Sequence, residues 1–410
     1  MTMHTLKDAI ELLEQSTKTY NNTSEILPLE CAQNRILAQD IYATKSLPSF
    51  DNSAMDGYAL NAKDSNKTLK IQTTIFAGDL QEIILEENAC VKIMTGAKIP
   101  KGANCVVPFE EIEGGFNNST HITTPKHLQA FANLRKCGEE ITQNTLLIKR
   151  GTLLNAEYLT LIATQGISHI RVFKLLNLVV FTSGNELKEP WEIANTSQIY
   201  NSNATMVQGI LKSLHFSSTY GGILQDTLEA IKLAFDTPSD VIFTTGGASK
   251  GEADFIRQVL EQNGAKILIN GVQIKPGKPI MVAYFQQKFI IALPGNPLAG
   301  GVMLRTLILP FLMQLSGANA HYPQYICLKA AANLKRKART EALLGSICKE
   351  NIHFTKNGKY GSGEVTPMAQ SNALVLLDES YGEIKEGDML KVLPFFANFG
   401  EEKQDCINRL

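Results

Sequence analysis

The feature of the sequence that most constrains its fold is the alternation of strand and helix patterns between residues 178 and 316. Short β-favouring runs (LVVF, STYGGIL, VIFTT, IMVAYF and FIIAL) stand between helical patterns such as ATMVQGILKSL, TLEAIKLAF and DFIRQVLEQNG. This alternation predicts an α/β fold, in which right-handed helical crossovers connect the strands of a parallel sheet. The run VIF at residues 241–243 is apolar throughout, as expected of a strand buried on both faces.

Polar and turn-forming residues follow several of these runs. They are Ser183, Gly184, Glu186, Asp226, Gly246, Gly247, Asp254, Pro294 and Pro297, together with Lys275 and Lys278 on the loop IKPGKP. Taken singly, each has a structural explanation, and Asp254 would serve as the N-cap of the helix after it. Because ligands bind at the carboxyl ends of strands in open α/β sheets, their gathering there favours one binding site.

The chemistry of these residues suits a polyanion held together with a divalent cation. Magnesium takes few carboxylates and otherwise water and phosphate oxygens, so we predict that Glu186, Asp226 and Asp254 are its ligands. Lysine supplies positive charge to an oxyanion, and the backbone amides of glycine turns bind phosphate. The sequence has neither GxxxxGK[ST] nor GxGxxG, which argues against a P-loop nucleotidase and a dinucleotide fold. None of its seven histidines lies in a loop with a GxSxG elbow, which argues against Ser/His/Asp catalysis.

The N-terminal half contains a turn-rich loop, LPSFDNSAMDGYAL at residues 47–60, that exposes two carboxylates, one of them Asp56. An ordinary Asp/Asn turn would explain it, but we expect the flanking Phe50, Met55 and Tyr58 to anchor the loop. Residues 69–124 then show short alternating runs, which predict a small β-rich module. Within it, the segment MTGAKIPKGAN carries Thr95 and is either a hairpin loop or part of a site.

The remaining patterns define the domain organisation. We predict a linker or dimer domain at residues 1–46 and 146–176, a β-rich inserted domain at 47–145, the α/β domain at 177–318 and a β domain at 324–410. In the first of these, a strand and then a helix are expected around ILPLECAQNRILAQDIYA. The last has the pattern of a small β-barrel or sandwich. Its basic run ends at Arg339 and is either a solvated face or part of the ligand site.

Composition narrows the class of protein. The chain is 44% hydrophobic and 19% charged with a net charge of −1, which is typical of a globular protein without a general affinity for nucleic acid. Its seven cysteines are scattered and form no CxxC pair, so we expect no zinc site, no disulfide framework and a reducing, cytoplasmic setting. The N-terminal pattern lacks the apolar core of a signal peptide, and we expect no apolar run that approaches the length of a membrane-spanning helix.

Five motifs in this order and spacing, SFDNSAMDGYA, IMTGAKIP, GEADF, IKPGKP and LPGNP, resemble the MoeA/gephyrin E-domain family of molybdopterin molybdenumtransferases. The resemblance covers essentially the whole chain. It implies a MoaB/MogA-like parallel α/β domain, a β-rich insertion in the N-terminal region and a small C-terminal β-barrel. It also implies the last step of molybdenum cofactor synthesis, in which adenylylated molybdopterin receives molybdate and AMP is released with the help of Mg²⁺ or a similar cation.

The resemblance further implies a homodimer, and it makes the adenylyltransferase and acceptor molybdoenzymes possible partners. Asp56 and Thr95 resemble site residues of the family's N-terminal half. The acids Glu186, Asp226 and Asp254, the lysines of KPGKP and the prolines of PGNP resemble those of its α/β domain, while Arg339 is a candidate for binding molybdate. The chain departs from the family pattern at four positions, which are Glu140, Asn185, Gln225 and Leu344.

Two alternatives remain open at this level. The departures are compatible with a paralogue that binds molybdopterin or serves as a scaffold with little turnover. A nucleotide-processing hydrolase of the CinA-like type would share the α/β domain, but it would need neither SAMDGYA nor the β-rich insertion.

Overall fold

The structure is a computed structural model that describes residues 3–18, 20–246, 253–335, 339–396, 399–400 and 407–408. The side chains of residues 253–254 and 399–400 lie outside this description. The chain forms two compact units. The first comprises Met1–Gln39, Arg150–Leu159 and His169–Leu410, and the second comprises Asp40–Lys149 and Thr160–Ser168.

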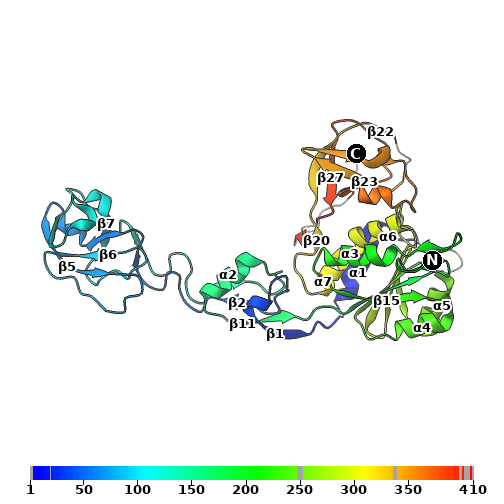
Figure 1. Ribbon diagram of the computed structural model, residues 1–410, viewed down its shortest axis with the longest axis horizontal. Coiled ribbons are helices and arrows are strands. Elements are labelled where there is room, and N and C mark those ends of the chain that lie inside the picture. The colour runs from blue at the N-terminus through cyan, green and yellow to red at the C-terminus, as the bar shows by residue number, and fades with distance from the viewer. Residues whose placement is uncertain are drawn as a thin grey trace. The chain divides into compact units, whose positions relative to one another are not determined.

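A six-stranded sheet is the centre of the first unit (Figure 1). Its strands, in spatial order, are β15 (Ser218–Leu224), β12 (Leu178–Ser183), β16 (Val241–Thr245), β19 (Lys288–Leu293), β18 (Met281–Phe285) and β17 (Lys266–Asn270). The strands β15, β12, β16 and β19 are parallel, as the alternation predicted, and β16 is buried along its whole length.

The prediction of an all-parallel sheet is wrong for one strand, because β18 runs antiparallel to both of its neighbours. A two-residue turn at Gln286 and Gln287, with φ of 48° and 63°, joins β18 to β19. Positive φ at both positions is the geometry of a type I′ hairpin turn, which usually has Asn-Gly or Asp-Gly. The pair Gln-Gln gave no such signal. Since β17 is in turn antiparallel to β18, it ends at the same edge as the four parallel strands.

Helices cover both faces of the sheet (Figure 1). One face packs on α1 (Leu6–Thr17), α3 (Asn203–Lys212), α6 (Pro297–Met303) and α7 (Leu309–Leu315), and the other packs on α4 (Leu228–Phe235) and α5 (Ala253–Gln262). Alternate residues of the central strand face opposite layers, since Val241 and Phe243 contact the first group and Ile242 the second. Helix α1 is closed at its start by a capping box between Thr5 and Asp8.

The helices α6 and α7 are joined by the π-helical turn η5 (Leu304–Ile308). This turn ends two residues before Pro310, whose ring would clash with the carbonyl four residues earlier in an unbroken α-helix. The helical segment Pro297–Leu315 is long and apolar enough to cross a membrane by length and composition, which corrects our expectation that no segment would be. Its most apolar window is 89% buried inside the fold, so packing in the core accounts for that composition.

A closed five-stranded barrel follows the α/β region, as predicted. Its strands are β21 (Ile326–Ala330), β24 (Asn351–Phe354), β23 (Glu341–Cys348), β25 (Ala373–Leu377) and β27 (Met389–Pro394). Near the N-terminus, β1 (Ser24–Pro28) pairs with β11 (His169–Phe173). The helix expected after β1 is absent from the described residues 20–42, where only the 3₁₀ turn η1 (Leu29–Cys31) and the short strand β2 (Ile41–Tyr42) follow.

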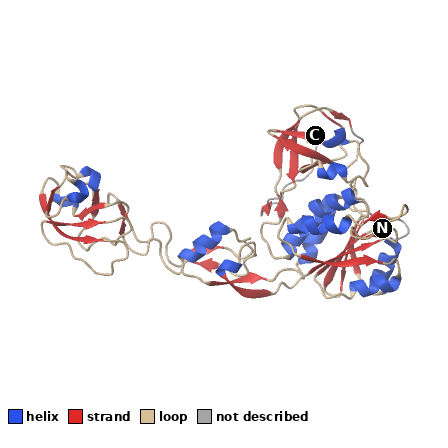
Figure 2. Cartoon of the chain, viewed as in Figure 1, coloured by secondary structure: helices blue, strands red, loops and turns tan. Residues whose placement is uncertain are grey.

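The second unit contains a five-stranded sheet (Figure 2). In spatial order it consists of β7 (Cys105–Pro108), β4 (Gly57–Leu60), β6 (Ala89–Ile93), β5 (Thr68–Ile75) and β8 (His121–Thr123). The end of the predicted loop at residues 47–60 is therefore a buried strand, β4, between β6 and β7. A side chain at Gly57 would overlap the backbone of the neighbouring strand, because an added Cβ would lie 2.2 Å from the Val107 carbonyl oxygen.

Short pairings complete the second unit. The strand β3 (Asn52–Ser53) pairs with β9 (Leu134–Arg135), and β2 pairs with β10 (Leu146–Ile148). The helix α2 (Ala156–Thr164) is shared between the two units, since its residues up to Leu159 belong to the first. Directly before it, the Asn155 side-chain carbonyl accepts a 3.0 Å hydrogen bond from the Tyr158 amide.

Candidate active site

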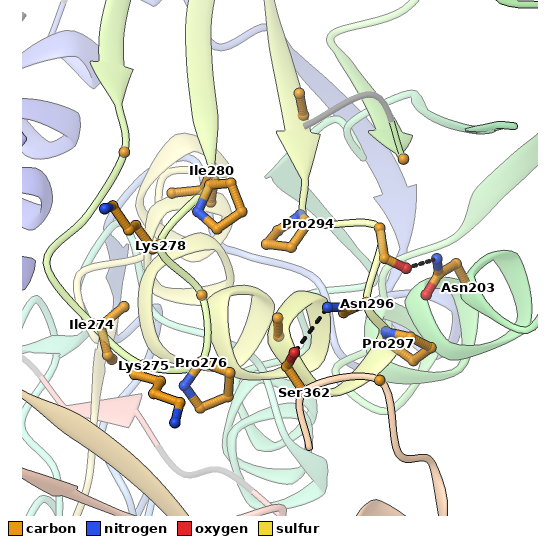
Figure 3. A pocket seen from close by; sticks show the side chains of 18 of the residues that line it. Asn203, Ile274, Lys275, Pro276, Lys278, Ile280, Pro294, Asn296, Pro297 and Ser362 are labelled. Atoms are coloured by element: carbon orange, nitrogen blue, oxygen red, sulfur yellow. Dashed lines mark hydrogen bonds between the residues drawn. The ribbon is translucent and has the colours of Figure 1, made fainter. Parts of the chain in front are cut away.

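A cavity of about 1260 Å³ lies in the first unit at the carboxyl ends of β12, β16, β17 and β19 (Figure 3). Many of its lining residues were predicted from sequence. These are Ser183, Glu186, Gly246, Lys275, Lys278, Pro294, Pro297 and Arg339. Because strand ends gather at one edge of the sheet, residues more than one hundred positions apart meet in one cavity.

The loop IKPGKP reaches this edge because β17 ends there and β18 starts there. Hydrogen bonds then fix it to the barrel: the Lys275 amide donates to the Thr340 carbonyl at 3.1 Å, and the Ala342 amide donates to the Lys275 carbonyl at 2.8 Å. Lys275 and Lys278 both lie on this loop (Figure 3). The barrel therefore holds the loop that carries the two lysines.

The PGNP turn follows β19 directly. The Gly295 carbonyl accepts a 2.7 Å hydrogen bond from Asn203 Nδ2, and Asn296 Nδ2 donates at 2.8 Å to Ser362 Oγ (Figure 3). A Cβ added at Gly295 would lie 3.3 Å from the Gly246 Cα, and a Cβ added at Gly246 would lie 2.2 Å from the Ser183 carbonyl oxygen. The turn at Gly246 therefore contacts both Ser183, at the end of β12, and the turn after β19, and its backbone approaches Ser183 so closely that only glycine fits at position 246.

The three predicted acids are placed differently. Glu186 is exposed and lines the cavity. Asp226 lies beside the cavity, outside its described lining, where its carboxylate accepts a 2.5 Å hydrogen bond from Ser183 Oγ. Gly247 and the Asp254 side chain lie outside the described residues. Within the described part of the chain, no group of three or more His, Cys, Asp or Glu is arranged to hold a metal ion.

Positive charge predominates among the described lining residues. Two cationic side chains, Arg257 and Arg339, join the two lysines of KPGKP, while Glu186 and Glu379 supply the carboxylates. Arg339 also lies 3.3 Å from Glu341 through its guanidinium Nη2. Gly184 follows the cavity-lining Ser183 and has a backbone φ of 149°. A Cβ added at Gly184 would lie 2.9 Å from the Glu186 carboxylate oxygens. A cavity with this charge balance suits an anionic ligand.

Sequence reasoning missed Arg257 and the cluster of Asn201, Ser202 and Asn203. The cluster leads into α3, with Ser202 as the N-cap and Asn203 as the first helical residue, and it lines the cavity at this helix start. A signal was present in the sequence NSNATMV, in which three polar residues precede an apolar helix pattern. No sequence pattern predicted that Arg257 would line the cavity, because this depends on which side of α5 faces the edge of the sheet.

The predicted site residues of the second unit form a compact arrangement of their own. Both the amide and the hydroxyl of Thr95 donate 2.7 Å hydrogen bonds to Asp56 Oδ1. These bonds, the amide first and the hydroxyl second, hold the pKa of the Asp56 carboxyl below its ordinary value. Asp56 is therefore an ionised, exposed and oriented carboxylate at neutral pH.

The expected anchoring of this loop is only partly right. Tyr58 is fully buried, and its hydroxyl donates a 2.8 Å hydrogen bond to the Gly115 carbonyl. Phe50 and Met55 are 41% and 42% exposed, so they do not anchor the loop. Backbone contacts serve instead, since the Cys137 amide donates at 2.8 Å to the Asp51 carboxylate.

The positions that depart from the family pattern also have local explanations. Arg135 binds two carboxylates. Its Nε lies 2.9 Å from Glu139, and its Nη2 lies 3.4 Å from Glu140. Leu344 is 2% exposed and belongs to the apolar core that includes the barrel strands. Asn185 and Gln225 are exposed near the cavity edge of β12 and β15.

Three family models match the chain in succession. The MoeA N-terminal region (domain I and II) matches residues 4–166, a probable molybdopterin binding domain matches residues 179–314, and the MoeA C-terminal region (domain IV) matches residues 328–395. A molybdopterin molybdenumtransferase of Haemophilus influenzae is 31% identical over 395 residues, covering 94% of this chain and 96% of that relative. This chain belongs to the MoeA family.

Further comparisons agree with membership of the MoeA family. A molybdopterin molybdenumtransferase of Staphylococcus epidermidis is 28% identical over 412 residues, which cover 97% of each chain. The crystal structure of a molybdopterin biosynthesis MoeA protein from Pyrococcus horikosii has a TM-score of 0.81 and 25% identity, with 96% of this chain and 99% of that chain covered.

These findings confirm the predicted family and the predicted fold class. The relatives described above carry the names of transferases or MoeA proteins, so they do not favour a binding-only paralogue. The match of residues 4–166 to the MoeA N-terminal model also argues against a hydrolase built on the α/β domain alone.

Proposed function

We propose that this chain inserts molybdenum into adenylylated molybdopterin, hydrolysing the adenylate and releasing AMP, as the last step of molybdenum cofactor synthesis. Membership of the MoeA family supports an enzyme of this kind. The observation that carries the proposal is the large cavity at the sheet edge, in which the KPGKP lysines and the glycine turns lie together. A pterin, a pyrophosphate and a nucleoside together need a cavity of this size and positive charge.

Magnesium or a similar divalent cation fits the residues that line this cavity. Magnesium often binds through one or two carboxylates plus substrate phosphates, so Glu186 with the pyrophosphate of the substrate is a sufficient donor set. We propose Asp226 and Asp254 as its further ligands. When bound, the cation would neutralise the charge that develops on the phosphate oxygens.

The residues of the chain would bind and orient the anionic groups. Lys275 and Lys278 supply point charges to phosphate or molybdate, and Arg339 is placed to join them from the barrel side of the cavity. Gly246 lines the cavity, where the backbone N–H groups of a glycine turn can bind a phosphate. We also propose the ionised Asp56, which Thr95 holds, as a catalytic residue.

We further propose that the protein works in the cytoplasm as a homodimer. It would take adenylylated molybdopterin from an adenylyltransferase and pass the finished cofactor to molybdoenzymes. Sedimentation of the purified chain tests the dimer, since a monomer at micromolar concentration would contradict it.

The test of the activity is incubation of the purified chain with adenylylated molybdopterin, Mg²⁺ and molybdate. AMP release that depends on molybdate is expected. Binding without release would identify a binding-only protein, and release without molybdenum insertion would identify a hydrolase.

A pair of variants tests the cation site. Glu186→Gln should raise the Mg²⁺ concentration needed for half-maximal AMP release. The matched control is Glu261→Gln, which removes the same charge from an exposed position near the end of α5. An equal response of the two variants to Mg²⁺ would refute Glu186 as a ligand.

A further inference from the structure

Two cavity-lining segments belong to a small ribbon that is separate from the six-stranded sheet. The ribbon pairs β13 (Leu187–Lys188) with β14 (Ile199–Tyr200). Glu186 directly precedes β13 and Asn201 directly follows β14, and both line the cavity. The side chains of β14 are 58% and 51% exposed, so burial contributes little to holding the ribbon. A pairing of two residues is also too short to fix its own position.

A chain of side-chain hydrogen bonds connects this ribbon to the sheet. Asn201 is 2% exposed, and its Nδ2 donates to Thr182 Oγ1 at 3.0 Å and to the Tyr220 hydroxyl at 2.8 Å. The Tyr220 hydroxyl in turn donates to Glu189 Oε1 at 2.5 Å. Thr182 and Tyr220 belong to the adjacent strands β12 and β15, whereas Glu189 and Asn201 flank the ribbon.

The order of donors and acceptors in this chain is fixed. Asn201 Oδ1 accepts a 3.3 Å hydrogen bond from the Ala204 amide, so a flipped amide would place its NH₂ group against another donor. Both Nδ2 hydrogens are used by Thr182 and Tyr220, and the amide therefore serves to hold structure. Burial, followed by the bond to Glu189, raises the pKa of Tyr220 to about 12, which keeps its hydroxyl protonated at neutral pH.

We propose that Tyr220 and Glu189 are positioning residues, which fix the ribbon so that Glu186 and the start of α3 keep their places in the cavity. Neither Tyr220 nor Glu189 is among the residues that line the cavity, so both act through the lining residues that the ribbon carries. The kinetic part of this inference rests on the proposed function. Its structural part does not, because it concerns only the mobility of the ribbon.

The chain offers a matched control for the central variant, Tyr220→Phe. The Tyr20 hydroxyl donates to Asp240 Oδ1, also at 2.5 Å and partly buried. Asp240 directly precedes β16, so this pair lies at the edge of the sheet opposite the cavity. Tyr20→Phe thus removes the same chemical contact from the same sheet without touching the ribbon.

The single tryptophan of the chain, Trp191, lies between β13 and β14 and is 76% exposed. Its fluorescence anisotropy therefore reports the mobility of the ribbon in the full-length protein, without any ligand. We expect Tyr220→Phe to lower this anisotropy and to raise the KM for adenylylated molybdopterin about tenfold, the order that loss of a hydrogen bond to a charged group produces. Tyr20→Phe should change neither.

Variants of the carboxylate complete the test. Glu189→Ala should resemble Tyr220→Phe, whereas Glu189→Gln, which keeps an acceptor for the tyrosine, should restore most of the anisotropy. Because the two residues act as one unit, the double variant of Tyr220→Phe and Glu189→Ala should be no worse than the poorer single variant.

Unchanged anisotropy in Tyr220→Phe, or an equal fall in Tyr20→Phe, would overturn the inference. A fall in anisotropy without any change in KM would overturn the link to the cavity. An inactive wild type would refute the proposed function, and the anisotropy comparison would still decide whether Tyr220 and Glu189 hold the ribbon.

Discussion

The contact between the turns after β12 and β16 makes Gly246→Ala the most informative stability variant. Alanine at the observed φ of +93° should cost about 1–2 kcal/mol, since L-residues avoid this region. The added Cβ would also lie 2.2 Å from the Ser183 carbonyl oxygen, and relieving such overpacking typically costs about 1–3 kcal/mol. Together, the expected loss in the free energy of unfolding is about 2–5 kcal/mol.

Gly222→Ala separates these two contributions. Gly222 has φ of +100° in β15, but no heavy atom lies within 4 Å of an added Cβ. Its variant should therefore lose only the conformational part, about 1–2 kcal/mol.

Urea unfolding followed by circular dichroism measures the loss in both variants. If Gly246→Ala and Gly222→Ala lost the same free energy of unfolding, the overlap with Ser183 would add no destabilisation. That result would refute our account of the packed turns. Because Ser183 Oγ also donates to Asp226, a displaced Ser183 should further raise the KM in Gly246→Ala but not in Gly222→Ala.

Three further predictions concern the candidate site residues. Asp56→Asn should lower the resistance to urea only slightly, because Asp56 is exposed, while abolishing AMP release; an unaltered rate would remove Asp56 from the site. Thr95→Ala should raise the Asp56 pKa only part of the way to its ordinary value, because the amide donor remains; carbon NMR titration checks this, and an unchanged pKa would contradict it. The folded pKa of Asp56 lies below the unfolded value of about 3.9, so the ionised carboxylate stabilises the folded protein above that pH. This stabilisation is lost as the pH falls through the folded pKa, and the loss should be smaller in Thr95→Ala. Lys278→Ala should raise the KM and weaken its dependence on salt, whereas Lys266→Ala, exposed at the opposite end of β17, should not; equal effects would mean that Lys278 acts only through net charge.

The α/β architecture was predictable because its central strands have unmistakable patterns. Residues 241–243 are apolar on both faces, and β16 is indeed buried along its length. The reversal at β18 was not predictable, since Gln286 and Gln287 adopt positive φ without the Asn or Gly that normally marks such a turn. Strand β4 was hidden for a different reason: the turn residues before it extended the apparent loop to residue 60.

The candidate site was predictable where strand ends alone determine position. Ser183, Gly246 and Pro294 meet because β12, β16 and β19 end at one edge. The contributions of Ser362 and Thr340 were not predictable, because they depend on how the barrel packs against the α/β region. Tertiary packing of this kind leaves no periodic signal in the sequence.

The packing of α1 determines when the first unit can finish folding during synthesis. Its apolar residues Leu6, Ala9 and Leu13 are buried against α7 and β17, which follow roughly two hundred and fifty to three hundred positions later in the chain. The ribosome therefore makes this helix first and its partners much later, after the whole second unit has been translated. Until residue 315 has been synthesised, the apolar residues of this segment lack part of the surface that buries them in the folded protein.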